Sequence, residues 1–124
     1  MRLLLILATL MVLGGSAWAQ GSGELFPQGQ KVFEDKCADC HRLNGKGLPG
    51  TFPAHDGNPF VMGDPKPVIA TVLNGRKSNL GPMPAWKDKL DDQQIAAVIS
   101  FIRQAWSNRA SAVTPAMVAA ARSK

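Results

Sequence analysis

Apolar side chains recur at helical spacing in three parts of the chain. These parts are residues 27–39, 64–74 and 90–106, and a short Ala-rich tail helix follows from Thr114 to about Arg122. Residues three and four apart share one face of a helix, so each segment presents an apolar stripe to a common core. Strand-like alternation of apolar and polar residues is scarce. The pattern predicts an all-α domain of three to five helices.

The first predicted helix begins at Pro27, since proline suits the first helical position, and runs to Asp39. Residues 20–26 are rich in Gly and Ser and are expected to form a flexible lead-in. Gly29 and Phe33 lie four residues apart and therefore share a face. Glycine permits close approach of two backbones. We therefore expect this face to cross the last helix.

The last helix has the clearest start signal in the chain. Asp91 is a good N-cap residue with Gln94 three positions later, and Leu90 and Ile95 can form a hydrophobic staple around this start. The middle helix is expected to end at Asn74-Gly75, because glycine favours the backbone conformation that follows a helix C-terminus.

The chain opens with a charged Arg2, an apolar run over residues 3–13 and the small-residue site Ala17-Trp18-Ala19. This order is typical of a secretory signal peptide, so residues 1–19 are predicted to be cleaved and the remainder exported to the periplasm. An uncleaved membrane anchor is the alternative, but the apolar run is short for a bilayer. Residues 27–124 are then expected to form a single domain.

Composition limits the classes of partner and the size of the core. The formal net charge is +5, and one positive charge would leave with the signal peptide. This modest excess, without a basic run interleaved with aromatic residues, favours docking to redox proteins with acidic surfaces over nucleic acid. The chain has no Tyr and nine Pro, so its own core is thin. Burial of a large apolar cofactor is expected to supply part of the folding free energy.

The chemistry centres on Cys37-Ala38-Asp39-Cys40-His41, the attachment pattern of a c-type haem. On a helical turn both thiols and the imidazole can face one planar cofactor. The thiols would add across two porphyrin vinyl groups, and His41 would reach the iron. A disulfide or a thioredoxin-like redox pair is the alternative, but the latter expects a βαβ context. A zinc site needs four ligands, and the chain has only two Cys and two His.

The second axial ligand is predicted to be Met83. Proline on both sides of it forbids a helix and leaves a stiff extended strip from which the thioether projects. Met62 and Met117 are the competing methionines, and for both ordinary core packing is the simpler interpretation. Trp86 is expected to form a wall of the cofactor pocket. Cys37, Cys40, His41, Met83 and Trp86 are thus the predicted cofactor-binding residues, and His41 and Met83 the predicted iron ligands.

The loop between His41 and residue 58 is rich in Gly and Pro and can wrap closely around a flat cofactor. A carbonyl from Pro49 or Pro53 is the expected acceptor for the second ring nitrogen of His41, and sequence alone does not choose between them. His55 is the alternative sixth ligand, which would make the iron bis-histidine, but we expect it to be a solvated loop residue.

The cysteine-histidine motif, the Pro-Met-Pro strip and the capped last helix occur in the order of the class I cytochromes c, and residues 27–106 resemble these small bacterial periplasmic monohaem proteins. The resemblance implies an all-α cytochrome c fold around one covalent haem c. Its thioether and axial roles fall on Cys37, Cys40, His41 and Met83. His55 departs from the family pattern, since an apolar residue is expected there.

His and Met ligation implies one-electron transfer, not catalysis, because no coordination position is open. We expect a carrier between a dehydrogenase or respiratory complex and an acceptor such as a terminal oxidase. A dedicated electron-transfer subunit of a periplasmic dehydrogenase or oxidase is the first alternative. A gas-binding sensor or peroxidase with five-coordinate iron is the second. The sequence shows no paired carboxylates, Ser-His arrangement or phosphate-binding loop that would support other catalysis.

Overall fold

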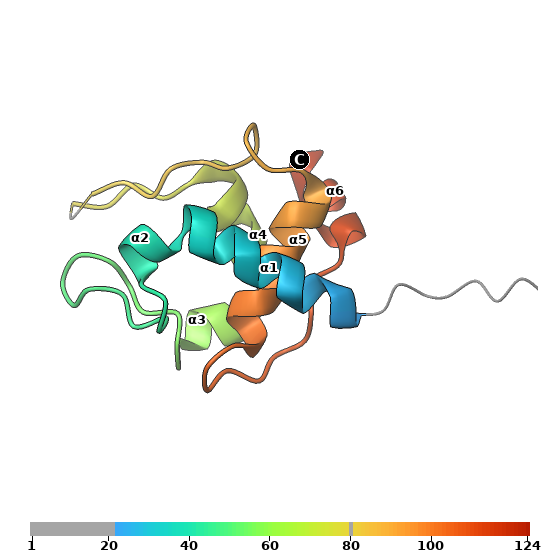
Figure 1. The fold of residues 1–124 in the computed structure, drawn as a ribbon. Helices are drawn as coiled ribbons and strands as arrows, with labels where there is room; N and C mark the ends of the chain where they lie inside the picture. The colour runs from blue at the N-terminus through green and yellow to red at the C-terminus, as the bar shows by residue number, and fades with distance from the viewer. Residues whose placement is uncertain (1–21, 80) are drawn as a thin grey trace, which may run out of the picture.

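The structure is a computed structural model that describes residues 22–79 and 81–124. Six helices occur in this part of the chain (Figure 1): α1 (Ser22–Lys36), α2 (Ala38–His41), α3 (Pro59–Met62), α4 (Pro65–Asn74), α5 (Asp92–Gln104) and α6 (Pro115–Arg122). The helices α2 and α3 are single turns. Strand pairing among the described residues is limited to two isolated bridges. The all-α class is therefore confirmed, while the predicted signal peptide, residues 1–19, lies outside the described residues.

Helix α1 begins earlier than the sequence predicts. It already includes Ser22, so Pro27 lies inside it and residues 22–26 are helical instead of a flexible lead-in. Proline lacks an N–H and disfavours a helix interior, which made Pro27 a plausible first residue. A tertiary contact outweighs that signal, since the ring of Phe26 packs 5.0 Å from the ring of Phe101 on α5. The helix also ends at Lys36, before the predicted Asp39.

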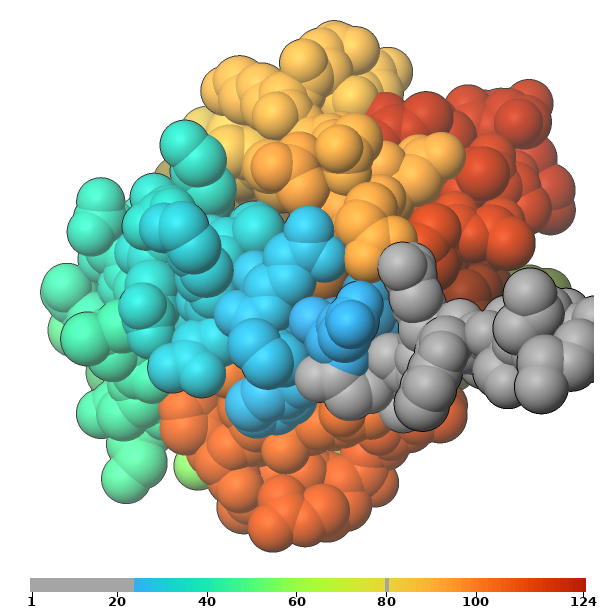
Figure 2. Space-filling view, turned by 45° about the vertical axis from the view of Figure 1, so that its right-hand side comes forward, coloured from blue at the N-terminus to red at the C-terminus, as the bar shows by residue number. Residues whose placement is uncertain are grey.

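Helices α1 and α5 cross in close contact, as predicted from Gly29. A Cβ atom placed on Gly29 would lie 1.9 Å from the carbonyl oxygen of Ala97 and 2.8 Å from Cβ of Phe101. Only glycine fits this crossing without displacing backbone. In the space-filling view α1 lies across the front, directly against the segment that follows α5 (Figure 2). Phe33, on the same face of α1 as Gly29, is fully buried.

The caps of α4 and α5 follow the sequence signals. The Asp91 carboxylate accepts a hydrogen bond from the backbone N–H of Gln94, and the Gln94 side chain accepts one from the backbone N–H of Asp91. The Asp64 carboxylate caps α4, and Gly75 ends that helix with φ of 73°. These local bonds satisfy backbone groups that a helix end leaves without partners.

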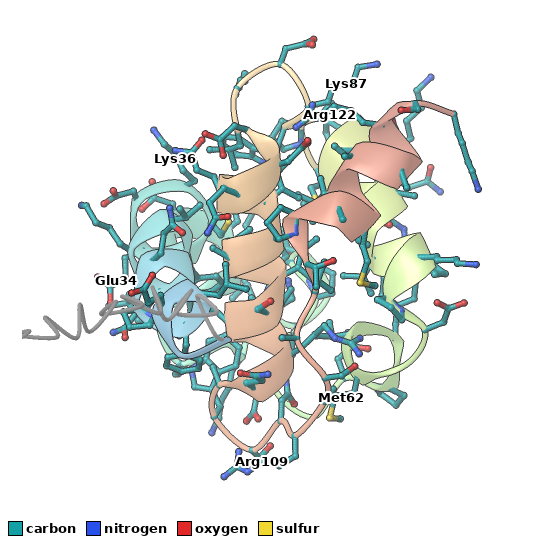
Figure 3. All side chains as sticks on the ribbon, turned by 90° about the vertical axis from the view of Figure 1, so that its right-hand side faces the viewer. Glu34, Lys36, Met62, Lys87, Arg109 and Arg122 are labelled. Atoms are coloured by element: carbon teal, nitrogen blue, oxygen red, sulfur yellow. The ribbon has the colours of Figure 1, made fainter. Side chains whose placement is uncertain are left out.

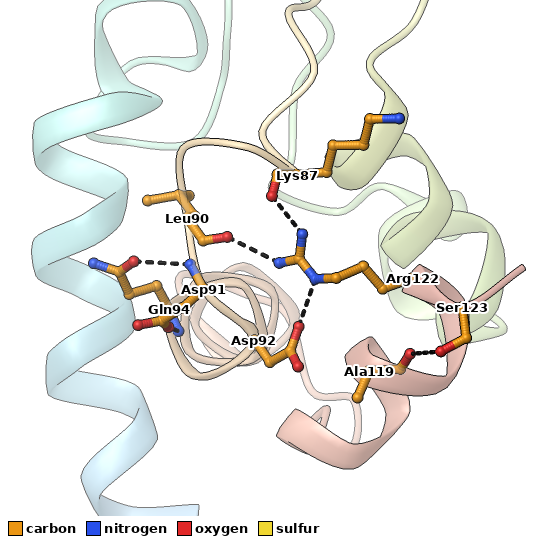
Figure 4. A network of polar contacts seen from close by, with 8 residues as sticks. All are labelled: Lys87, Leu90, Asp91, Asp92, Gln94, Ala119, Arg122 and Ser123. Carbon is orange, nitrogen blue, oxygen red and sulfur yellow. Dashed lines mark hydrogen bonds and ion pairs between the residues drawn. The ribbon is translucent and has the colours of Figure 1, made fainter.

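The tail helix α6 is tied to the start of α5 by Arg122 (Figure 4). Its Nε donates to Asp92 at 2.7 Å, its Nη2 donates to the carbonyl of Leu90 at 2.9 Å, and its Nη1 donates to the carbonyl of Lys87. The predicted tail helix is therefore a packed element of the domain.

A second arginine braces the opposite end of α5. Arg103 is almost fully buried, and its Nη1 donates to the carbonyls of Val61 at 2.7 Å and Gly63 at 2.8 Å. Its Nε donates to the carbonyl of Ser111 at 2.8 Å. Burial lowers the pKa of the Arg103 guanidinium. These bonds hold the corner between α3 and α4 against α5.

The core consists of apolar side chains from α1, α3, α4, α5 and α6. Val68, Ile69, Val72 and Leu73 of α4 are all buried, as are Ile95, Val98, Ile99 and Ile102 of α5, in agreement with the predicted stripes. Among the described residues, no helix combines the length and the apolar content that a membrane crossing requires.

Candidate haem site

The two cysteines and His41 lie on consecutive turns at the end of α1. Cys37 joins α1 to α2, since its N–H donates to the carbonyl of Phe33 and its own carbonyl accepts from the N–H of His41, both at 2.9 Å. Cys40 and His41 then belong to α2. The motif is thus held on a nearly continuous helical path, although α1 itself stops at Lys36.

Both cysteines are free thiols, with Cys37 half-buried and Cys40 exposed. Burial, and to a smaller extent the neighbouring Cys40, raises the pKa of the Cys37 thiol to about 11. A redox-active Cys-x-x-Cys pair needs the opposite, a lowered thiol pKa that favours the thiolate. The raised pKa of Cys37 is therefore the opposite of what the thioredoxin-like alternative requires.

The imidazole of His41 is oriented by Pro53. Its Nδ1 lies 2.9 Å from the carbonyl oxygen of Pro53, so Nδ1 carries the proton and donates it. This contact selects Pro53 over Pro49, the choice that the sequence leaves open. His41 is 9% exposed, and its Nε2 remains as the nitrogen with a free lone pair. A backbone carbonyl that holds one ring nitrogen is the usual support of a metal-binding histidine.

The loop after His41 folds back tightly because of its glycines. The N–H of Gly47 donates to the carbonyl of His41 at 2.9 Å, and Gly45 and Gly47 both have positive φ. A Cβ on Gly45 would lie 2.7 Å from the ring of Trp106, and one on Gly47 would lie 2.2 Å from the carbonyl oxygen of Phe52. Glycine is therefore required at both positions for the loop to lie against the helices.

His55 is not the solvated residue that the sequence predicts. Its ring stacks on the ring of His41, with centroids 4.0 Å apart and planes 21° apart, and its Nδ1 is buried without a hydrogen-bond partner. Burial, with a smaller contribution from His41, lowers the pKa of His55 to about 3. The prediction was wrong because a Gly- and Pro-rich segment is typical of exposed loops, whereas here the loop folds inward against α1 and the end of α5.

Asn108 holds this loop in place, a role that sequence reasoning missed. It is fully buried, its Oδ1 accepts from the N–H of Gly57 at 2.8 Å, and its Nδ2 donates to the carbonyls of His55 and Ile102 at 2.9 and 2.7 Å. Nearby, the N–H and the hydroxyl of Ser107 both donate to the Asp56 carboxylate. No local sequence signal pairs residues about 50 positions apart.

Met83 lies on an extended strip, as predicted from its flanking prolines. The backbone N–H of Met83 donates to the carbonyl of Arg76 at 2.8 Å, and the backbone N–H of Arg76 donates to the carbonyl of Met83 at 3.0 Å. In Figure 1 residues 76–79 and 81–85, which form the strip, and the 42–58 loop extend on the same side of the α1–α5 pair, one above α2 and the other below it. The Met83 side chain is half-buried and packs against the core cluster.

Trp86 is anchored beside this strip. Its backbone N–H donates to the carbonyl of Val72 at 3.0 Å, and its half-buried side chain packs against the core cluster. Of the two competing methionines, Met117 packs against the core from α6. Met62 lies at the lower edge of the molecule in Figure 3, at the end of α3.

The chemistry of this donor set fits a haem c. Two free thiols at the Cys-x-x-Cys spacing suit attachment to two vinyl groups, and His41 offers Nε2, since its Nδ1 donates to the carbonyl of Pro53. Met83 adds a soft thioether on a restrained backbone. An α-helical domain that carries such a set is typical of c-type cytochromes.

Comparison with known proteins identifies the family. Residues 24–102 match the family described as cytochrome c oxidase, cbb3-type, subunit III, and the chain belongs to it. The family confirms the resemblance to class I c-type cytochromes, and with it a haem-binding, electron-transfer domain instead of a catalytic enzyme.

Individual relatives include dehydrogenase subunits and a cytochrome c. The chain is 37% identical over 90 residues to the cytochrome c subunit of alcohol dehydrogenase (quinone) from Gluconacetobacter polyoxogenes, and the match covers 66% of this chain and 19% of that protein. It is 35% identical over 109 residues to the gluconate 2-dehydrogenase cytochrome c subunit of Pantoea cypripedii, and this match covers 81% of this chain and 25% of that protein. It is 32% identical over 114 residues to cytochrome c-552 of Thermus thermophilus, and this match covers 82% of this chain and 72% of that protein. The chain thus spans a quarter or less of the dehydrogenase subunits.

Proposed function

We propose that this protein is a periplasmic one-electron carrier with a single haem c attached through Cys37 and Cys40 and ligated by His41 and Met83. The observation that carries the proposal is the hydrogen bond from His41 Nδ1 to Pro53, which leaves Nε2 available beside two free thiols. The family match and the restrained Met83 backbone support it.

Each residue has a defined task in this proposal. A haem held by an imidazole and a thioether supplies exchange of one electron between Fe(III) and Fe(II), with no open coordination position. The thiols of Cys37 and Cys40 fix the ring to the chain. Pro53 keeps His41 in one tautomer, and Met83 provides a soft sulfur that favours the reduced state. Trp86 excludes water from the Met83 side.

Redox proteins are the partners that the surface suits best. Three large apolar side chains are exposed: Leu43 at 68% and Leu48 at 42% in the loop after His41, and Phe60 at 44% at the start of α3. Exposed apolar groups and an excess of positive charge favour brief docking on an acidic partner surface. The dehydrogenase relatives suggest a dehydrogenase or respiratory complex as donor, and the oxidase-subunit family suggests an oxidase as acceptor.

The first experiment is the mass of the exported protein. We expect a chain that begins at Gln20, after cleavage of residues 1–19, and that carries the mass of one haem through denaturation. Replacement of Cys37 and Cys40 by Ala should abolish this covalent mass. Bare thiols or a disulfide in the wild-type protein would refute the proposal.

The second experiment addresses the axial ligand. Met83→Ala should lower the midpoint potential and remove the six-coordinate low-spin spectrum of the reduced protein, because the sulfur that favours Fe(II) is lost. Met62→Ala is the matched control and should leave both unchanged. A wild-type spectrum of five-coordinate iron would instead favour a gas-binding sensor or peroxidase.

A dedicated electron-transfer subunit is the second candidate, because the dehydrogenase relatives are themselves subunits. Purification of the native protein decides between the two. A monomer that exchanges electrons with several partners supports a carrier. Co-purification in a fixed ratio with a catalytic chain supports a subunit.

A further inference from the structure

His55 is a polar side chain at the candidate site to which the proposed function assigns no role. Its ring covers one face of the His41 ring at a centroid distance of 4.0 Å and an angle of 21°. Its Nδ1 is buried and has no hydrogen-bond partner, which is a costly arrangement for a side chain that serves only to fill space. An apolar residue would fill the same space without that cost.

The position of His55 is imposed by the fold around it. Its N–H donates to the carbonyl of Gly45 at 2.7 Å, and its carbonyl accepts from Nδ2 of Asn108 at 2.9 Å. The rings of Phe33 and Trp106 lie 5.9 and 6.5 Å from its centroid. Backbone bonds on both sides and two aromatic rings therefore hold the imidazole against His41.

We propose that His55 is a positioning residue for the proximal ligand: it fixes the plane of the His41 ring and places a polar group beside it, which lowers the midpoint potential of the bound haem. This inference rests on the proposed function, since it concerns the same site. It adds a determinant of ligand orientation and potential that the thiols, His41 and Met83 do not supply.

Orientation needs two restraints. The hydrogen bond to Pro53 holds one atom of the His41 ring, and the ring can still rotate about the line of that bond. Contact between the two ring faces removes this rotation. Pro53 and His55 together therefore define both the direction and the plane of the ligand.

The effect on potential has a predictable sign. Apolar surroundings favour the less charged Fe(II) state, because the more charged Fe(III) state loses more solvation. A polar imidazole stabilises Fe(III) better than a hydrocarbon of similar size. Replacement of His55 by an apolar residue should therefore raise the midpoint potential.

The test uses haem-loaded wild-type protein and three variants, His55→Leu, His55→Phe and His55→Gln. The midpoint potential and the electron paramagnetic resonance spectrum of the ferric protein, which reports the axial-ligand planes, are measured for each. For His55→Leu we expect both to change, with an increase in the reduction equilibrium constant of up to about tenfold, or about 59 mV for one electron. For His55→Phe we expect a raised potential with the wild-type spectrum, since the stack is kept. His55→Gln keeps a polar group, so its midpoint potential should be close to that of the wild-type protein.

Controls separate the possible failures. Thr51→Ala, an exposed change in the same loop, should leave potential and spectrum unchanged. Covalent haem mass and a low-spin spectrum verify that each variant is folded and carries haem. If one variant fails this check, the potentials and spectra of the remaining variants decide the test. A wild-type potential and spectrum in a loaded His55→Leu or His55→Phe protein would overturn the inference alone. Absence of covalent haem in the wild-type protein would overturn the proposed function.

Discussion

Asn108 shows how one side chain can join two separate backbone segments, the loop at residues 55–57 and the last part of α5. Its amide bonds to Gly57, His55 and Ile102, and it is fully buried. The amide has both donors and an acceptor, so it satisfies an N–H and two carbonyls that would otherwise be buried without partners. The loop that places Pro53 and His55 therefore depends on a residue beyond the end of α5.

Replacement of Asn108 by Ala should be strongly destabilising. The change removes three hydrogen bonds and leaves their partners unsatisfied, at a cost of about 2–4 kcal/mol in the free energy of unfolding. Denaturant unfolding of the haem-loaded protein measures it. Asn44→Ala, in the same loop but exposed, is the control and should cost much less. Equal losses for both variants would contradict the assigned role.

Asp56 gives the loop a defined dependence on pH. Hydrogen bonds from the hydroxyl and the N–H of Ser107 hold the pKa of Asp56 below its ordinary value of 3.8. The unfolded chain therefore binds this proton more readily than the folded one, and the stabilisation is complete above about pH 3.8 and is lost as pH falls through the lower folded value.

The difference in unfolding free energy between wild type and Ser107→Ala should therefore shrink on acidification below about pH 4. Denaturant unfolding of both proteins from pH 6 to pH 2.5 measures this difference. Asp56→Asn should show the same shallower pH dependence as Ser107→Ala. A constant difference across that range would show that the carboxylate does not provide the stabilisation.

At the scale of elements, the crossing of α1 and α5 is the contact on which the domain depends. The crossing brings backbone against backbone at Gly29. It fixes the direction in which the C-terminus of α1 presents the Cys37–His41 motif. The same crossing buries Phe33, whose ring contacts those of His55 and Trp106. The packing of α1 against α5 therefore also determines the geometry of the site.

Gly29→Ala should lower the free energy of unfolding by about 1–3 kcal/mol, because the new methyl group meets the Ala97 carbonyl and forces the helices apart. Alanine normally stabilises a helix, so intrinsic propensity predicts the opposite sign. Gln30→Ala, exposed on the same helix, is the matched control and should be close to neutral. A stabilised Gly29→Ala protein would show that the crossing is looser than described.

At the scale of the whole molecule, the cofactor belongs to the fold as much as to the function. The motif and the strip with Met83 lie on the same side of the α1–α5 pair, and both carry half-buried apolar groups, Met83 and Trp86 among them (Figure 1). A haem bound there would join the two sides of the domain through covalent bonds and axial ligands. Binding to the folded state alone stabilises that state.

The protein without haem should therefore be poorly folded. Replacement of both Cys37 and Cys40 by Ala, which prevents attachment, is expected to lower the helical content and to broaden or abolish cooperative thermal unfolding. Circular dichroism with a temperature scan measures both. The haem-loaded wild-type protein is the reference. A cooperative transition at the wild-type temperature would show that the peptide core suffices by itself.

The sequence alone determined the features that depend on neighbours along the chain. The sequence predicted four features correctly because the signal for each lies in residues a few positions apart. These are the helical periodicity, the Asp91 capping box, the glycine at the α1–α5 crossing and the strip at Met83. The cysteine-histidine motif and the final helix also carried the resemblance that the family match confirms. The assignment of His41 and Met83 as iron ligands stays a prediction.

The tertiary structure alone decided what depends on residues distant in sequence. It extended α1 past Pro27 through the contact of Phe26 with Phe101, it chose Pro53 to orient His41, and it turned His55 from a predicted surface residue into the neighbour of the ligand. In each case a local preference of at most a few kcal/mol competes with burial and hydrogen bonding to a remote segment. Those remote contacts exist only once the chain has folded, and no pattern of neighbouring residues encodes them.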